Sequence, residues 1–414
     1  MSATTLEGIR RPRRTAVRAA GREQARLASG QLLAGVGNLA FALICARVLA
    51  PAQYSHLAAF LAAYLLLYMP FSALAAGGAL DPAVTSRRRR NSLGMGAFAG
   101  LALLALATLG VGPEIGMPTS LLVILACSAP VAGLLALQRG RALGEEHPDA
   151  AISSLLAEPL CRLGLGVLAA LSFGASGAAA TVAIGGYAAT VAAARRTRPS
   201  AAPGLSRPQP AATGAVTAAF VLLALLQNQD ILWANAQLSS AQASLFAVLS
   251  TLGGMAAFAS TTVPLVLLPR ARRGERGALS AAVGAAALLG LVAVVPMALE
   301  GHAIISMVFG PRYGAVAPLV VPYLLAMALL GVSRVLVAHR CAVGSPRPVL
   351  GVLAVCAITQ AALIVLLGHS AGDVSHATLA ACGVLAAGLG AVALRSRPRQ
   401  PRNKLHALDR APQD

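Results

Sequence analysis

The chain has 414 residues, of which 57% are hydrophobic and 11% are charged, and its mean hydropathy is +0.73. This composition excludes an ordinary soluble domain. The formal net charge of +19 does not indicate nucleic-acid binding, because the basic residues stand in short segments beside long apolar runs, where they favour contact with anionic lipid headgroups.

About twelve apolar segments follow one another along the chain, each near the roughly 20 residues that a membrane-spanning helix needs. The first six lie near 29–49, 56–79, 92–112, 119–138, 150–172 and 176–194. The second six lie near 212–236, 242–268, 278–299, 314–338, 347–367 and 375–394. We therefore predict an all-α polytopic membrane protein of about twelve transmembrane helices in two six-helix bundles, in which abundant small residues let helices approach closely.

The distribution of Lys and Arg predicts the orientation of these segments. Of the 33 basic residues, 29 precede the first segment, follow the last, or fall in alternate connections. Cytoplasmic loops of membrane proteins carry such an excess, so we expect both termini in the cytoplasm and the chain in the cytoplasmic membrane. The four exceptions are Arg47, Arg162, Arg312 and Arg334.

The polar stretches divide the chain into five parts. These are a basic tail (1–28), a first bundle (29–194), a Pro/Arg-rich linker (195–213), a second bundle (214–394) and a second basic tail (395–414). Two bundles joined by a linker are typical of secondary transporters.

A short internal similarity supports a duplication. Leu49 to Ser55 and Leu238 to Ser244 share the pattern L-x-x-A-Q-x-S at an offset of 189 residues. Both copies follow the opening segment of their half, where a duplication would place them.

Ionisable side chains inside predicted spans are costly in lipid and are therefore candidate substrate-binding residues. Glu158 and Arg162 stand four residues apart on one helix face, with Pro159 between them. They form either a structural ion pair or a site where Arg162 meets an anionic substrate and Glu158 releases it. Arg334 in the tenth segment either binds substrate or extends to the membrane surface.

Amide and acidic residues in the two opening segments are further candidates. Gln227, Asn228 and Asp230 in the seventh segment are expected to line a water-filled cavity or the seam between bundles, or else to hold neighbouring helices together by hydrogen bonds. Gln31 and Asn38 share one face of the first segment, and Asn38 corresponds to Gln227 under the 189-residue offset. That face either points amides toward the centre or packs against another helix, and both interpretations stay open.

The sequence predicts no catalytic residues, no metal site and no cofactor. The six Cys stand singly, and no phosphate-binding loop, nucleophile elbow or dinucleotide motif is present. His369, Asp373 and His376 fall close together in one predicted loop, which we interpret as a polar loop without further ligands. The chain is therefore expected not to be an enzyme.

Two stretches resemble a known family. Ala46 to Ser55 is similar to the A-R-x-L-G-P-x-x-Y-G segment that joins the first two spans of polysaccharide-biosynthesis flippases, with Ala50 and Ser55 in place of the usual glycines. Val308 to Ala315 resembles the F-G-x-x-Y-x-x-A segment before that family's tenth span, and Asp230 to Pro269 resembles its seventh and eighth spans.

The resemblance implies a Wzx-like flippase of the multidrug/oligosaccharidyl-lipid/polysaccharide (MOP) exporter superfamily. Such a protein would move an undecaprenyl-diphosphate-linked sugar across the membrane by alternating access. Its implied partners are this polyprenyl-linked glycan, anionic membrane lipids and other polysaccharide-assembly membrane proteins. Arg162 is the candidate to meet the diphosphate, on chemical grounds and not from a matched motif.

Three alternatives remain open at this point. A major-facilitator transporter also has twelve spans in two halves, but its signature loop is matched here only by Gly78 to Asp81 and Arg87 to Arg90, with the wrong spacing. A multidrug-type exporter of small solutes and a non-transporting membrane scaffold are the other two.

Overall fold

The computed structural model describes residues 29–78, 85–144, 148–196, 210–260, 277–343 and 346–395, together with Arg26 and Val263. All regular structure in these residues is helical, as the composition predicts. Both predicted basic tails, apart from Arg26 and Arg395, and positions 197–209 of the linker lie outside them. The division into the five predicted parts stays a prediction.

The first half opens with a helix over Ser29–Val48. Its further long helices are α2 (Pro51–Gly78), α3 (Thr85–Thr108), α4 (Thr119–Gly144), α5 (Pro148–Cys161) and α6 (Val167–Arg196). Two short helices are η2 (Pro113–Ile115) and the π-helical turn η3 (Arg162–Gly166). Pro is the first residue of α2 and α5, a position where its fixed φ suits the helix and its missing N–H costs nothing.

The second half contains seven helices in the described residues. They are α7 (Pro210–Gln237), α8 (Ser240–Ser260), α10 (Ala278–Val308), η4 (Pro311–Val316), α11 (Ala317–Val343), α12 (Arg347–Leu367) and α13 (Ala371–Arg395). Pro again begins α7.

Ten helical segments of the described chain are long and apolar enough to cross a membrane. One of them, Asp149–Arg196, has 48 residues, more than twice the roughly 20 that a crossing needs. It is interrupted at Gly174, whose φ of 63° and ψ of −146° are not helical, between the predicted fifth and sixth segments. The chain is thus an all-α polytopic membrane protein, while the count of twelve and the side on which the termini lie stay predictions.

Helix α13 begins at Ala371, four residues before the predicted 375, because a capping interaction was missed. The Ser370 hydroxyl accepts the backbone N–H of Asp373 at 3.2 Å and donates to its carboxylate at 2.8 Å. Asp373 and His376 therefore belong to the first turns of a helix and not to a loop, which corrects that expectation.

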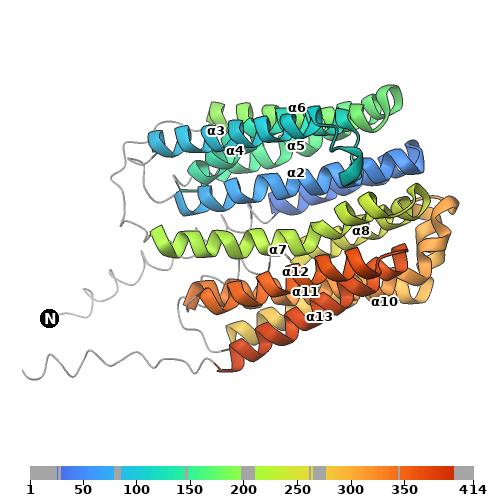
Figure 1. Cartoon of the computed structure of the whole chain (residues 1–414). Coiled ribbons are helices and arrows are strands. Elements are labelled where there is room, and N and C mark those ends of the chain that lie inside the picture. Colours follow the sequence, from blue (N-terminus) through green and yellow to red (C-terminus); the bar gives the residue numbers. More distant parts are fainter. Residues whose placement is uncertain are drawn as a thin grey trace, which may run out of the picture.

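The two halves lie side by side in Figure 1, with α2–α6 in the upper part of the view and α7–α13 in the lower part. Where they meet, α2 packs against α7 and α8, and η2 packs against α7. We call the end that carries Arg195, Arg196, Arg340 and Arg347 the basic end, at the left of Figure 1. The other end, with η2 and η4, is the opposite end.

Exposure and packing have the pattern expected in lipid. Large apolar side chains such as Phe98, Phe173 and Leu299 are about three-quarters exposed, which suits contact with lipid and not with water. Between α3 and α4, a Cβ on Gly96 or Gly100 would lie 2.8–2.9 Å from a backbone carbonyl oxygen of α4. Small residues four apart therefore let these two helices approach closely.

The repeated L-x-x-A-Q-x-S pattern has the same structural role in both halves. Ser55 and Ser244 each donate to the carbonyl three residues before, at 2.9 and 2.7 Å. Gln242 accepts the N–H of Ala371 at 3.0 Å, beside the turn before α13. Gln53 lies against Gly174, the matching turn of the first half, where a Cβ would come within 2.9 Å of its Nε2. These matched contacts support the duplication.

Candidate functional site

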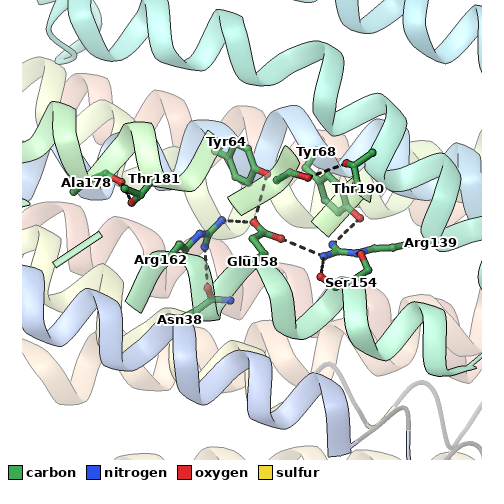
Figure 2. Close-up of polar contacts among 11 residues, drawn as sticks. Asn38, Tyr64, Tyr68, Arg139, Ser154, Glu158, Arg162, Ala178, Thr181 and Thr190 are labelled. Atoms are coloured by element: carbon green, nitrogen blue, oxygen red, sulfur yellow. Dashed lines mark hydrogen bonds and ion pairs between the residues drawn. The ribbon is translucent and has the colours of Figure 1, made fainter. Parts of the chain in front are cut away.

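A buried ion cluster lies within the first half, and Glu158 of α5 is its centre (Figure 2). One carboxylate oxygen accepts from Arg139 of α4 at 3.2 Å, and the other accepts from Arg162. The Tyr64 hydroxyl of α2 donates to the same oxygen as Arg162, at 3.4 Å. The side chains of the three charged residues are only 8–14% exposed, so these charges are held by one another and not by solvent.

Arg139 of α4 donates hydrogen bonds to two other helices, α5 and α2. Its Nε donates to the Ser154 hydroxyl at 3.0 Å, and one terminal nitrogen donates to the Ser154 carbonyl at 3.0 Å. The other terminal nitrogen donates to the Tyr68 hydroxyl at 3.1 Å. This buried role was missed, because Arg139 follows the predicted fourth segment and was counted among the basic residues of a connection.

Arg162 begins the π-helical turn η3, three residues after Pro159. Pro lacks the N–H that would continue the α-helical ladder, and π-turns occur where that ladder is interrupted, often at functional sites. From this turn Arg162 donates to the Asn38 amide oxygen of the first helix at 2.8 Å. The first helix comes close here, since a Cβ on Gly37 would lie 2.9 Å from Cβ of Pro159.

The charge of the first cluster does not cancel. Arg139 and Arg162 carry two positive charges and Glu158 carries one negative charge, so the cluster has a net charge of about +1. The guanidinium carbons of Arg139 and Arg162 each lie 5.7 Å from the ring centre of Tyr68 and Tyr64, respectively, within cation–π range. The Nε of Arg162 is buried and has no hydrogen-bond partner among the described residues, so this guanidinium has one further donor to offer.

The second half holds a buried arginine of a different kind, Arg334 of α11. One terminal nitrogen donates to the Ala257 carbonyl at 2.8 Å and to the Ser260 hydroxyl at 3.4 Å. The other donates to the Gln227 amide oxygen of α7. All three acceptors are neutral, and within the described residues no carboxylate pairs with this guanidinium. It is 9% exposed, which contradicts the alternative that it extends to the membrane surface.

Asp230 lies one turn from Gln227 on α7 and has no exposed surface. Its carboxylate accepts from the Tyr323 hydroxyl at 2.6 Å and from the backbone N–H of Ile231 at 2.8 Å. Next to it, Gln229 donates to Gln360 of α12 at 2.7 Å. The acid therefore lies in a polar layer between α7, α11 and α12.

The remaining candidates are not part of these clusters. The Asn228 side chain donates to the Ala224 carbonyl of its own helix at 2.8 Å. Gln31 is half-buried, two turns before Asn38, and takes no part in the contacts described above. The structure thus joins Arg162, Glu158 and Asn38 in one cluster and Arg334 with Gln227 in another. It separates both from Asp230.

The opening helices of the two halves each bind a buried arginine through an amide side chain, and the two amides are at matched positions. Asn38 and Gln227, related by the 189-residue offset, each accept a hydrogen bond from a buried arginine of their own half. The arginines themselves are not at matched positions, since η3 follows α5 in the first half and α11 is a different helix of the second. Tyr64 and Gln227 belong to α2 and α7, the helices through which the halves meet.

The described part of the chain contains no group of three or more His, Cys, Asp or Glu side chains that could together hold a metal ion.

Comparison with known proteins places the fold. No protein-family model matches the chain, and no curated protein sequence matches it. Among solved structures, it is similar to the lipid II flippase MurJ in an inward closed conformation, with a TM-score of 0.70 and 12% identity over 89% of this chain and 87% of that one.

Two further similar structures are conformations of a multidrug resistance MATE family transporter of the MOP superfamily. The inward-facing one has a TM-score of 0.64 at 13% identity and covers 90% of this chain and all of that one. The outward-facing one has a TM-score of 0.63 at 15% identity and covers 90% and 97%. At these identities the likeness establishes the fold, and the chain has the fold of MOP-type transporters.

Proposed function

We propose that this chain is a membrane transporter that moves a lipid-linked oligosaccharide across the cytoplasmic membrane by alternating access. The fold it shares with a lipid II flippase and a multidrug transporter supports the transporter part of this proposal. The segments around Arg47 and Arg312, which resemble those of polysaccharide flippases, support the oligosaccharide part. Anionic lipids and other polysaccharide-assembly proteins remain its proposed partners.

The observation that carries the proposal is the pair of buried arginines that the opening helices hold. A diphosphate needs fixed cationic donors, and a guanidinium presents them in a planar fork. Arg162 already shares Glu158 with Arg139, so an anion there would compete with a carboxylate. Arg334 has only neutral acceptors among the described residues, so an anion would meet its full charge. We therefore assign Arg334 the larger share of anion binding and Arg162 the smaller one.

Asp230 has a separate proposed role. Its carboxylate accepts hydrogen bonds from Tyr323 and Ile231, and none of the described hydrogen bonds joins it to Arg162 or Arg334. A carboxylate in such a layer responds to a proton or cation and not to an anionic substrate. We therefore expect Asp230 to affect the rate of transport and not the selection of the phosphate group.

Export of small solutes is the second candidate, because the structural match extends over the whole length of the MATE family transporter. The two functions differ in what the arginines do. A polyprenyl diphosphate requires them, whereas many cationic drugs would be repelled by them. The net positive charge of the buried clusters thus favours an anionic substrate.

The test is translocation in proteoliposomes that contain the purified chain and a fluorescent polyprenyl-diphosphate oligosaccharide. Arg334→Gln is expected to reduce the rate about tenfold or more, which corresponds to about 1.4 kcal/mol or more of lost binding. Arg162→Ala is expected to reduce it less. Arg196→Gln, which removes an exposed positive charge at the end of α6, is the matched control and should retain the rate.

The outcomes separate the alternatives. If the chain translocates the glycan lipid and Arg334→Gln does not slow it, the assignment of anion binding to Arg334 is wrong. Absence of translocation together with accumulation of a cationic dye would favour the small-solute exporter. Absence of both activities would favour a scaffold.

A further inference from the structure

Two arginines at the opposite end reach across from one half to the other. Arg47, at the end of the first helix, donates through Nε to the Val308 carbonyl at 2.9 Å and through a terminal nitrogen to the Met307 carbonyl. Arg312, in η4 of the second half, donates to the carbonyls of Ala46, Arg47 (3.2 Å) and Leu49 (2.9 Å). Arg47 of the first helix therefore binds the C-terminal end of α10, and Arg312, which follows α10, binds the C-terminal end of the first helix.

The acceptors explain why arginine stands at both positions. The last carbonyls of a helix have no partner in their own helix and carry its partial negative charge. Met307 and Val308 are the last two residues of α10, and Ala46 and Arg47 lie in the last turn of the first helix. A guanidinium can serve two such carbonyls at once, so each half satisfies the end of a helix in the other half.

Two further contacts cross the same junction, and a third lies beside it within η4. The Tyr54 hydroxyl of α2 lies 2.6 Å from that of Thr251 in α8, and since Thr251 donates to Ala247, Tyr54 is the donor. The Tyr313 ring lies 6.4 Å from the Tyr54 ring, and the Arg312 guanidinium lies 5.0 Å from the Tyr313 ring centre.

The backbones are also close at this end. A Cβ added to Gly116, after η2, would lie 2.6 Å from the backbone nitrogen of Ala236 near the end of α7. Gly116 has a φ of +68°, a conformation that favours glycine, and so the turn can approach α7 without a side chain between them. The two halves are therefore in direct contact across the opposite end.

We propose that Arg47 and Arg312 form a latch, made of the hydrogen bonds that each donates to the other half, and that this latch keeps the transport path closed at the opposite end. The path opens there only when these hydrogen bonds are broken. This inference rests on the proposed alternating access and goes beyond it, because it names the groups that control one of the two openings. The five hydrogen bonds link the same two helix ends. They must therefore be lost together when those ends separate, which makes the closure a two-state contact.

Cys45 provides a direct readout, because it is fully buried one residue before Ala46. The experiment uses the full chain with the other five cysteines replaced by serine, in sided membrane vesicles. A charged, membrane-impermeant thiol reagent is applied to the side that faces the opposite end. The rate of Cys45 labelling then measures how often that end opens.

In this background Arg47→Gln combined with Arg312→Gln is expected to raise the rate of Cys45 labelling about tenfold or more, and each single change is expected to raise it less. Arg196→Gln removes the same charge from an exposed site and should leave the rate unchanged. A second background that retains only Cys382, also fully buried, detects general unfolding. Labelling of Cys45 with Cys382 still protected would support the latch.

Unchanged Cys45 labelling in the double variant would overturn the proposal, and so would equal increases at Cys45 and Cys382. If the double variant does not accumulate, Arg47→Lys is used in its place. Lysine keeps the charge but cannot bind two carbonyls through a planar fork, so labelling must still rise, and an unchanged rate again overturns the latch. The labelling needs no substrate, so a failure of the glycan-lipid assignment would appear in the translocation assay and not here.

Discussion

Replacing Glu158 with Gln should destabilise the first half strongly, because this carboxylate is the only negative charge in a cluster with Arg139 and Arg162. Glutamine has nearly the same shape but leaves two guanidinium groups buried with a net charge of about +2. Removing one partner of a buried ion pair typically costs about 3–5 kcal/mol.

The magnitude can be expressed as a thermal shift. If the unit that unfolds is of the size of one half, each kcal/mol lowers the midpoint by about 2–4 °C. A loss of 3 kcal/mol therefore predicts a decrease of roughly 6 °C or more for Glu158→Gln, measured on the purified protein in detergent. The double variant Glu158→Gln/Arg162→Met restores the net charge of the cluster to about +1, and should regain part of this loss because an apolar replacement of a buried pair is tolerated.

A second Arg–carboxylate pair provides the matched control. Arg26 and Asp149 lie 3.1 Å apart, close to the distance between Arg139 and Glu158, but their side chains are 64% and 66% exposed. Exposed pairs contribute about 0–1 kcal/mol. Asp149→Asn should therefore hardly change the midpoint. Equal shifts for Asp149→Asn and Glu158→Gln would refute the reasoning, because burial would then not determine the cost.

Two further predictions concern packing in the second half. Gly253→Ala would place a Cβ against the Tyr323 ring and should lower the thermal midpoint by the equivalent of about 1–3 kcal/mol. Gly254→Ala would meet no atom of the described residues within 4 Å and should be neutral, so equal effects would contradict the packing. Gln360→Leu removes the acceptor of Gln229 and should cost about 0.6–2 kcal/mol in the same measurement, while no change would show that this buried hydrogen bond is not needed.

The sequence was a good guide to the helices and a weaker guide to the contacts between them. Hydropathy located most segment starts, including residues 29, 119, 278 and 347, because a run of about 20 apolar residues is typical of a membrane-spanning helix. It placed the start of α2 at 56, five residues late, because polar residues after Pro51 looked like a connection. It also ended the ninth segment at 299, whereas α10 continues to Val308 through a distorted Glu300.

The contacts within the site could be predicted only where the residues lie close together in the sequence. Glu158 and Arg162 share a helix, so their contact follows from their spacing. Arg139 was missed because its contacts depend on how α4 lies against α5. The contacts of Arg47 and Arg312 join positions 260 or more residues apart, and no local pattern encodes them. Their presence in the two segments that resemble flippases was the only indication that they matter.

The choice of acceptors distinguishes the arginines that can move from those that hold the structure. Two unit charges 4 Å apart attract by about 4 kcal/mol at an effective dielectric constant of 20, so separating an arginine from a carboxylate within a membrane is costly. A hydrogen bond from a charged donor to a neutral oxygen contributes only about 1.5–3 kcal/mol and leaves no unpaired negative charge behind.

By this criterion the cluster around Glu158 is a rigid element of the first half. Arg334, Arg47 and Arg312 have only neutral oxygens as hydrogen-bond acceptors in the described residues, and they can exchange them for substrate or solvent at lower cost. A transport cycle needs a stable frame and a few groups that change partners. We therefore expect substitutions at Glu158 to act mainly on stability, and substitutions at Arg334, Arg47 and Arg312 to act mainly on the rate of transport.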